Sequence, residues 1–449
     1  MSNQKFISAS EFCDLVTDGT HDSPKKTETG IKLVTSKNIV GGSLDLTSAY
    51  FISELDARNI NKRSQVHIND VLLSMIGTVG EVALIEKEPD FVIKNVGLLK
   101  NSDSKKARWL YYYLKSPISQ NLIKDRLRGT TQQYIPLGEL RNLPILKPNS
   151  EEHLQNTIDQ LSSLDKKIQL NTQINQTLEQ IAQALFKSWF VDFDPVRAKV
   201  QALSDGLSLE QAELAAMQTI SGKTPEELAA LSQAQPNRYA ELAETAKAFP
   251  CEMVEVDGVE VPKGWEIGTF TDITESRREK VKNDKATVLS AVSSGELVKS
   301  EEYFTKQVFS KNIDKYLKVY QWDFAYNPAR INIGSIGLHE ADYLGAVSPV
   351  YEVFSVSDKY HWFLKRILNL ETTKIKIQSL CTGSVRQTLK LKDFQSIDCV
   401  IPDEKTLSIF NKKWEEYRTL ILENNENTQT LSEIRDLLLP RLLSGDFND

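Results

Sequence analysis

The chain repeats itself once, with a period of about 254 residues. The segment RGTTQQYIPLGELRNLPILKP (residues 128–148) has the same plan as TGSVRQTLKLKDFQSIDCVIP (residues 382–402). Two further pairs keep the same order: SMIGTVGEVAL (74–84) with NIGSIGL (332–338), and TLEQIAQALFKSWFVDF (177–193) with TLSEIRDLLLPRLLSGDF (430–447). Self-similarity at a fixed period constrains the whole architecture. It predicts two copies of a globular unit, each followed by a helix.

The length agrees with several domains, because 449 residues exceed the roughly 250 to 300 residues that one hydrophobic core usually serves. We expect five segments: a first globular unit at 1–150, a central spacer helix at 151–199, an acidic, Ala-rich helical connector at 200–250, a second globular unit at 251–403 and a C-terminal spacer helix at 404–449. The start TPEE at residue 224 favours a helix within the connector.

Each globular unit mixes short β-rich runs with one helical pattern. VLLSMIG, EVALI and LPILKP in the first unit, and ATVLSAV, SPVYEVFSV and SIDCVIP in the second, are typical of strands. ARWLYYYLKSPISQNLIKDRL and DKYHWFLKRILN have helical periodicity. The fold class predicted for the globular units is therefore α+β.

The two spacer segments carry apolar residues in steps of three and four, which predicts a coiled-coil seam. We place in this seam Leu161, Leu164, Ile168, Asn171, Leu178, Leu185 and Trp189 of the first copy, and Trp414, Tyr417, Ile421, Asn424, Leu431, Leu438 and Leu442 of the second. Asn171 and Asn424 occupy equivalent positions, where they either fix the register or face water at a splayed point. An antiparallel pairing of the two helices would give the copies a pseudo-two-fold relation.

The net charge of −7 is distributed unevenly. Residues 201–260 hold 3 basic and 11 acidic side chains, whereas residues 1–150 hold 20 basic and 16 acidic ones, and residues 261–400 hold 20 and 17. The globular units are thus mildly basic, which permits a nucleic-acid surface without requiring one.

Several features point to a cytoplasmic protein. No apolar run approaches the roughly 18 residues of a membrane span, so we expect no membrane contact. The opening MSNQKFISASEF lacks the basic and apolar regions of a secretion signal. The four cysteines are scattered, and we expect each to be a reduced thiol.

Signs of catalysis are weak. NPAR at 327–330 begins like the tetrad of DNA amine methyltransferases, but Ala329 and Arg330 replace the second proline and the aromatic residue, so we expect a turn before a strand. Asp90, with Asp103 and Lys105, matches the loose spacing of metal nucleases, a pattern that often arises by chance. Neither a phosphate-binding Gly-x-x-x-x-Gly-Lys loop nor a metal-type histidine pair is present in the sequence. We expect no catalytic residues and no metal in this chain.

Binding residues are more evident. Arginine can pair with guanine, glutamine and asparagine with adenine, and lysine and threonine with phosphates. The candidates for DNA contact are Lys105, Lys106, Arg126, Arg128, Thr130, Thr131, Gln132, Gln133 and Tyr134 in the first unit, and Arg277, Arg278, Lys280, Arg330, Asn332, Ser384, Arg386 and Gln387 in the second. For any one of them, an ordinary solvated surface residue is the alternative.

The alternation of globular units with spacer helices resembles the DNA-specificity (S) subunit of type I restriction-modification systems. The resemblance spans nearly the full chain and lies in VTDGTHDSP (16–24), LVTSKNI (33–39), LEQIAQALFKSWFVDFDPVRAK (178–199), VPKGW (261–265), NPARINIGSIGL (327–338) and LLLPRLLSGDF (437–447). It implies a non-catalytic protein, whose two target recognition domains each read one half of a split, asymmetric DNA site.

The resemblance also implies partners. The spacer helices would dock two methyltransferase subunits, which bind S-adenosylmethionine and methylate adenine, and restriction/translocase subunits using ATP and Mg would join the complex. A helix from Leu161 to Trp189 would be about 43 Å long at ~1.5 Å per residue. That length suits two readers about one turn of B-DNA (~34 to 36 Å) apart.

Other functions remain open at this point. The chain could be a DNA-modifying enzyme, either a fused methyltransferase or a nuclease at Asp90, or a coiled-coil scaffold that contacts no bases. The two units also differ: the first opens with Gly19, Thr20 and His21, and the second lacks this element. We therefore expect the two units to read different sequences.

Overall fold

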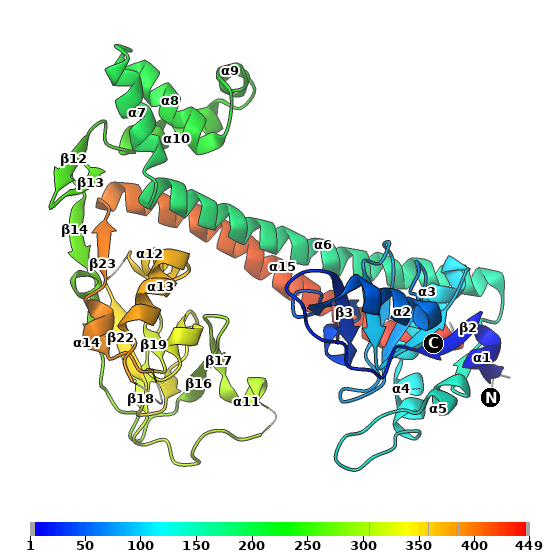
Figure 1. The fold of residues 1–449 in the computed structure, drawn as a ribbon. Coiled ribbons are helices and arrows are strands. Elements are labelled where there is room, and N and C mark those ends of the chain that lie inside the picture. Colours follow the sequence, from blue (N-terminus) through cyan, green and yellow to red (C-terminus); the bar gives the residue numbers. More distant parts are fainter. Residues whose placement is uncertain (1–4, 305, 358, 384–386, 446–449) are drawn as a thin grey trace. The chain divides into compact units, whose positions relative to one another are not determined.

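The computed structural model describes residues 5–304, 306–357, 359–383 and 387–445. It divides into two compact units: unit 1 comprises Met1–Ile174 with Leu422–Asp449, and unit 2 comprises Asn175–Ile421. Two long helices, α6 (Glu151–Phe190) and α15 (Glu404–Ser444), contribute to both units. Figure 1 shows these helices side by side.

Unit 1 contains an antiparallel four-stranded sheet of order β2-β10-β7-β8, a three-stranded sheet of order β6-β3-β9 and the pairs β1-β11 and β4-β5. Its strands are β1 (Phe6–Ser8), β2 (Leu15–Asp18), β3 (Ile31–Thr35), β4 (Ile39–Val40), β5 (Ser43–Leu44), β6 (Tyr50–Ile52), β7 (Val71–Ser74), β8 (Val82–Leu84), β9 (Phe91–Lys94), β10 (Val96–Lys100) and β11 (Pro144–Leu146). Its shorter helices are α1 (Ala9–Phe12), η1 (Ser36–Asn38), α2 (Glu54–Ser64), α3 (Ser104–Lys115), α4 (Pro117–Lys124) and α5 (Leu137–Arg141).

Unit 2 repeats this arrangement, with sheets of order β15-β22-β19-β20 and β17-β16-β21-β18 and the pair β14-β23. Its strands are β14 (Glu266–Thr269), β15 (Thr274–Ser276), β16 (Thr287–Ala291), β17 (Leu297–Lys299), β18 (Leu317–Val319), β19 (Phe324–Tyr326), β20 (Ile336–Leu338), β21 (Gly345–Val347), β22 (Glu352–Val356) and β23 (Asp398–Ile401). Its shorter helices are η2 (Phe270–Asp272), α11 (Ser300–Tyr303), η3 (Ile331–Ile333), α12 (His361–Leu368), α13 (Glu371–Leu380) and α14 (Leu391–Gln395).

The two units share most of their strand pairing. β3 pairs with β9 in parallel and with β6 antiparallel, and β16 pairs with β21 in parallel and with β17 antiparallel. The sheets of order β2-β10-β7-β8 and β15-β22-β19-β20 are antiparallel throughout. The predicted α+β class, with two similar units and two long helices, is confirmed.

The single helical pattern predicted at ARWLYYYLKSPISQNLIKDRL is in fact two helices. Ser116 is extended (φ −68°, ψ 150°), and its side chain accepts a hydrogen bond from the Ser119 amide as the N-cap of α4. Pro117 takes the first position of that helix. The residue before a proline is disfavoured in helical conformation, so α3 ends there. NPAR likewise leads first into η3 and only then into β20.

The hydrophobic core of unit 1 is completed by the long helices. Trp109 of α3 is fully buried and donates from its indole nitrogen to the Leu146 carbonyl at 2.7 Å. The same cluster includes Leu154, Ile158, Leu161, Leu439, Leu442 and Leu443. The globular part of unit 1 therefore cannot bury its apolar face without α6 and α15.

The hydrophobic core of unit 2 is also completed by the long helices, here largely through aromatic residues. Trp362 of α12 is 1% exposed and donates to the Glu415 carboxylate at 2.7 Å. Phe186, Phe190 and Phe410 of the long helices meet edge-on or tilted at 5.3 to 5.6 Å between ring centroids. This cluster makes the second half of α6 part of the core of unit 2.

The long helices pair antiparallel in both units. In unit 1 the Asn171 amide donates to the Asn424 carbonyl at 3.5 Å, and in unit 2 the Asn175 amide donates to the Ile421 carbonyl at 3.3 Å. All of the residues placed in the seam by sequence are buried or half-buried. α6 has 40 residues, so it extends beyond the seam pattern of Leu161–Trp189 but ends nine residues before the expected boundary of the spacer segment at 199.

The connector consists of α7 (Asp194–Ser204), α8 (Leu209–Ser221), α9 (Pro225–Ala234) and α10 (Pro236–Ala248). Thr224 caps α9 and forms a reciprocal capping box with Glu227. A hairpin of β12 (Met253–Val256) and β13 (Val259–Pro262) follows. In the described part of the chain, no helix is long and apolar enough to cross a membrane.

A half-buried ion pair joins α6 to α15 in unit 1, and a tyrosine of α3 bonds to the same carboxylate. Asp165 of α6 accepts from the Tyr112 hydroxyl at 3.0 Å and from Arg435 of α15 at 3.0 Å. Arg435 is 17% exposed and also contacts Asp436, which is 63% exposed.

We predict that Asp165→Ala destabilises unit 1 by about 2 kcal/mol, because the half-buried guanidinium and the tyrosine hydroxyl both lose their shared carboxylate acceptor. Calorimetry should show a melting temperature lower by about 4 to 8 °C. Asp436→Ala is the matched control, since it removes an exposed carboxylate from the same arginine and should shift the melting temperature by about 1 °C or less. Equal shifts for both variants would contradict this assignment.

A buried histidine makes the stability of unit 2 depend on pH. His339 is 3% exposed, and its ring Nε2 donates to the Tyr343 carbonyl at 2.7 Å. Burial lowers the pKa of His339, although the bond to the carbonyl partly raises it. Below about pH 6.5 the unfolded chain takes up a proton that the folded histidine resists, so the folded state loses stability as the pH falls. Urea unfolding at pH 7.5 and 5.5 should show this loss in the wild type and a smaller one in His339→Gln.

Candidate nucleic-acid interface

In unit 1 the candidate residues of the opening repeat form a closed hairpin. The amide of Arg128 donates to the Tyr134 carbonyl at 2.8 Å, and the amide of Tyr134 donates back to the Arg128 carbonyl at 2.9 Å. Between them lie Thr130, Thr131, Gln132 and Gln133, all exposed. Two backbone bonds therefore hold a loop whose polar side chains face solvent.

The hairpin is attached to the turn between β7 and β8. The Gly77 amide donates to the Gln133 carbonyl at 3.1 Å, and the Ile135 amide donates to the Met75 carbonyl at 3.0 Å. Gly77 has φ +81°, which favours glycine. The turn and the hairpin thus form one continuous polar surface, to which exposed Thr78 also contributes. This turn lies in the repeated segment SMIGTVGEVAL (74–84), but its place beside the hairpin is not predicted from the sequence.

Unit 2 has the same hairpin 254 residues later. Thr382 and Thr388 exchange two backbone hydrogen bonds of 3.0 and 2.8 Å. The Asn332 amide group donates to the Gln387 side chain at 3.3 Å, which joins the turn before β20 to this hairpin. Two other candidates, Ser384 and Arg386, lie outside the described residues.

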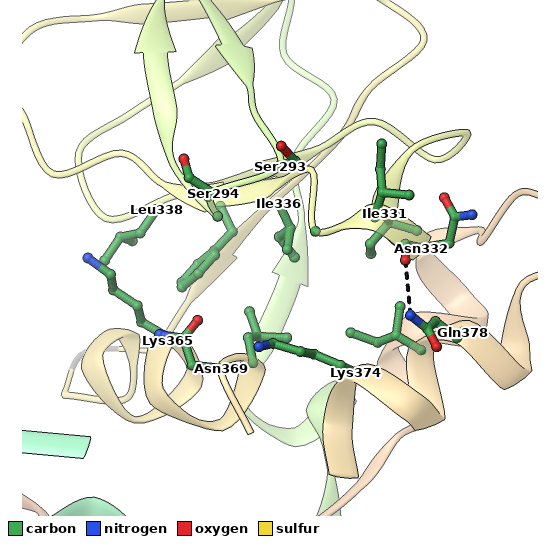
Figure 2. Close-up of a pocket in the computed structure, with 17 residues that line it drawn as sticks. Ser293, Ser294, Ile331, Asn332, Ile336, Leu338, Lys365, Asn369, Lys374 and Gln378 are labelled. Atoms are coloured by element: carbon green, nitrogen blue, oxygen red, sulfur yellow. Dashed lines mark hydrogen bonds between the residues drawn. The ribbon is translucent and has the colours of Figure 1, made fainter. Parts of the chain in front are cut away.

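A cavity of about 330 Å³ opens beside Asn332 in unit 2. Figure 2 shows Ser293 and Ser294 on one side and Lys365, Asn369 and Lys374 on the other, with a hydrogen bond from Gln378 to Asn332. Apolar side chains also line it: Phe324, Ile331, Ile333, Ile336, Leu338, Leu368 and Ile377. The cavity therefore combines an apolar interior with a polar, cationic rim.

Other candidates in unit 1 are engaged in local structure. Lys105 pairs with Glu151 at 3.2 Å, and its amide and that of Lys106 donate to Asp103, the N-cap of α3. Arg126 is half-buried and donates to the Leu122 carbonyl at 2.8 Å. These residues are not part of the hairpin surface.

The Arg128 side chain pairs with Glu139 at 2.9 Å but is 53% exposed. It therefore remains a candidate on the surface of the hairpin. In unit 2, Arg277 pairs with buried Asp323 at 2.8 Å and Arg278 with Glu352 at 2.5 Å. Lys280 is exposed and its backbone pairs with Leu317.

Arg330 is exposed at the start of the turn that carries Asn332. The structure thus brings Arg330, Asn332 and Gln387 together, and it places Arg277 and Arg278 in ion pairs at the sheet.

The patterns that suggested catalysis have local structural uses. The Asp103 carboxylate caps α3, and the Asn327 side chain accepts the Ala329 amide at 3.1 Å within its turn. Among the described residues, no group of three His, Cys, Asp or Glu side chains is placed to hold a metal ion.

The chain is similar to several known proteins. The family model for the type I restriction modification DNA specificity domain matches residues 1–180. The specificity subunit of the type I restriction enzyme HindI from Haemophilus influenzae is 43% identical over 352 residues, which cover 73% of each chain. The MjaIX specificity subunit from Methanocaldococcus jannaschii is 22% identical over 84% of this chain and 77% of its own.

Solved structures include an S subunit from M. genitalium, with a TM-score of 0.49, 15% identity and coverage of 98% of this chain and 97% of that one. The identity and extent of the match to the HindI subunit establish the relationship. The chain belongs to the family of type I restriction enzyme specificity subunits.

Proposed function

We propose that this chain is the DNA-specificity subunit of a type I restriction-modification complex and that each unit reads one half of a bipartite, asymmetric DNA site. The observation that carries the proposal is the pair of hairpins at Arg128–Tyr134 and Thr382–Thr388. They occupy the same position in two copies of one framework and are closed by the same backbone bonds. Their sequences differ, so the two readers select different bases.

The chemistry of these surfaces suits the major groove. Exposed Gln132 and Gln133 in unit 1 and exposed Gln387 in unit 2 can each pair with adenine N6 and N7, and Arg330 can pair with guanine. Because backbone bonds close each hairpin, the side chains within it can change without loss of the fold. This separation of framework and contact residues is what a protein with variable specificity requires.

The partners belong to the same proposal. We expect the paired helices to act as spacer and as docking surface for two methyltransferase subunits, which carry S-adenosylmethionine, and restriction/translocase subunits using ATP and Mg to join the assembly. Outside the seam the helices expose apolar residues, including Ile181 at 40% and Ile434 at 41%, which lie 253 positions apart in the two copies. Exposed apolar side chains at equivalent positions suit two identical partners. The chain itself would bind no cofactor and perform no chemistry.

We predict that the complex of this chain with its methyltransferase subunits protects two short blocks of DNA separated by an unspecific gap. Footprinting on the site found by methylation mapping in the host measures this directly. Uniform, salt-sensitive protection would instead indicate a scaffold without base readout. Methylation or cleavage of DNA by the purified chain alone would show that it is an enzyme.

The two hairpins should act on different blocks. Gln132→Ala with Gln133→Ala should weaken protection of one block about 10- to 100-fold, because an amide pair to a base contributes about 1 to 3 kcal/mol. Gln387→Ala should weaken only the other block. Gln233→Ala, an exposed glutamine on α9, is the control and should change neither. Loss of both blocks in either hairpin variant would contradict independent reading.

A further inference from the structure

We propose that Ile333 of unit 2 recognises a thymine by packing against its 5-methyl group in the major groove. This inference rests on the proposed function and adds a specificity-determining residue to the second reader. It starts from an exposed apolar side chain: Ile333 is 54% exposed at the end of η3, whereas Ile331 of the same turn is 3% exposed.

The backbone around Ile333 is held firmly. The Ile333 amide donates to the Arg330 carbonyl at 3.2 Å, and the Gly334 amide donates to the Ile331 carbonyl at 2.9 Å. Gly334 has φ +89°, and a Cβ there would lie 2.8 Å from the Ser293 carbonyl oxygen. The turn therefore presents a β-branched side chain with little freedom to lose on binding.

The surroundings of Ile333 suit DNA. Asn332 precedes it and contacts Gln387 of the hairpin, and Arg330 lies at the start of the same turn. Across the rim of the cavity stands Lys374, whose ammonium group has no hydrogen-bond or ion-pair partner within the described part of the chain. An apolar group flanked by amides and cations matches a base edge that lies beside phosphates.

At the corresponding position of unit 1, the isoleucine side chain is less exposed. Its counterpart Ile76 is half-buried and its backbone pairs with Tyr134 of the hairpin. Gln120, which lies 254 positions before Lys374, donates to the Gly80 carbonyl at 2.9 Å and to the Leu114 carbonyl at 2.7 Å. At these two positions, the exposed isoleucine and the unpaired lysine therefore occur in the second reader and not in the first.

Thymine is the base that such a side chain would select. Its 5-methyl group is the apolar feature that base pairs present in the major groove, and aliphatic or aromatic side chains contact it there. Asn332 or Gln387 could meet the paired or neighbouring adenine at the same time. The geometry points to a thymine in the half-site read by unit 2.

The test uses the full chain in complex with its methyltransferase and fluorescent duplexes that carry the site found by methylation mapping. Each thymine of the two half-sites is replaced in turn by deoxyuridine, which lacks only the methyl group. In the wild type, one replacement in one half-site should weaken binding about fourfold, the effect of one buried methyl group. Ile333→Ala should bind both duplexes equally, and Ile333→Val should keep most of the discrimination.

Val259→Ala provides the matched control, because Val259 is a 49% exposed residue of the β12–β13 hairpin, and it should discriminate as the wild type does. The inference is overturned if Ile333→Ala keeps the sensitivity to the methyl group, or if it weakens assembly with the methyltransferase in gel filtration instead. In both cases the two protected blocks would remain and the proposed function would stand. A wild-type complex that protects no half-site would overturn the proposed function itself.

Discussion

The antiparallel pairing of α6 with α15 is the interaction on which both units depend. In unit 1 the first part of α6 and the last part of α15 supply Leu154 and Leu442 to the core beneath Trp109. In unit 2 the opposite parts supply Phe186 and Phe410 to the core beneath Trp362. In each unit one face of the antiparallel four-stranded sheet, β2-β10-β7-β8 or β15-β22-β19-β20, packs into a core that contains residues of the long helices. Folding of these sheets is therefore coupled to pairing of the helices. The side-chain amides of Asn171 and Asn175 donate hydrogen bonds across this pairing to the Asn424 and Ile421 carbonyls.

The framework is duplicated at the level of single interactions. Asp70 and Asp323, 253 positions apart, each accept the amide of the residue three positions earlier, at 2.8 and 2.9 Å, and so form the turn before the central strand. Their cationic partners differ: Lys100 pairs with Asp70, and Arg277 pairs with Asp323. The framework thus preserves the geometry of the turn while the surrounding charges change. The same division separates the backbone bonds that close the two hairpins, which are alike, from the hairpin sequences, which are not.

Much of the fold was predictable because it follows from periodic or repeated features. The period near 254 residues indicates two copies, and the steps of three and four place Leu161 and Ile421 in a seam. The break between α3 and α4 was missed because the apolar pattern continues through Pro117, although the proline itself was a local signal. The short helices α5 and α14 were missed because a five-residue helix has too little periodicity to detect.

The candidate surfaces were predictable only in part. Exposed hairpin residues such as Gln132 are predictable, because a run of polar residues beside a turn can be recognised in the sequence. Arg277 and Lys105 could not be separated from them, because their acidic partners, Asp323 and Glu151, are distant in the sequence. Ile333 could not be singled out, since exposure of an isoleucine depends on the tertiary structure around it.

The central claim is that each unit reads its half-site independently on a shared framework. The most direct test uses a variant chain in which residues 251–403 replace residues 1–150. Methylation is then mapped in cells that carry this variant as their specificity subunit. With two copies of the second reader, the methylated sequence should become an inverted repeat of the second half-site around a central gap. Methylation at the original asymmetric site, or at a site unrelated to the second half, by an assembled complex would contradict the account.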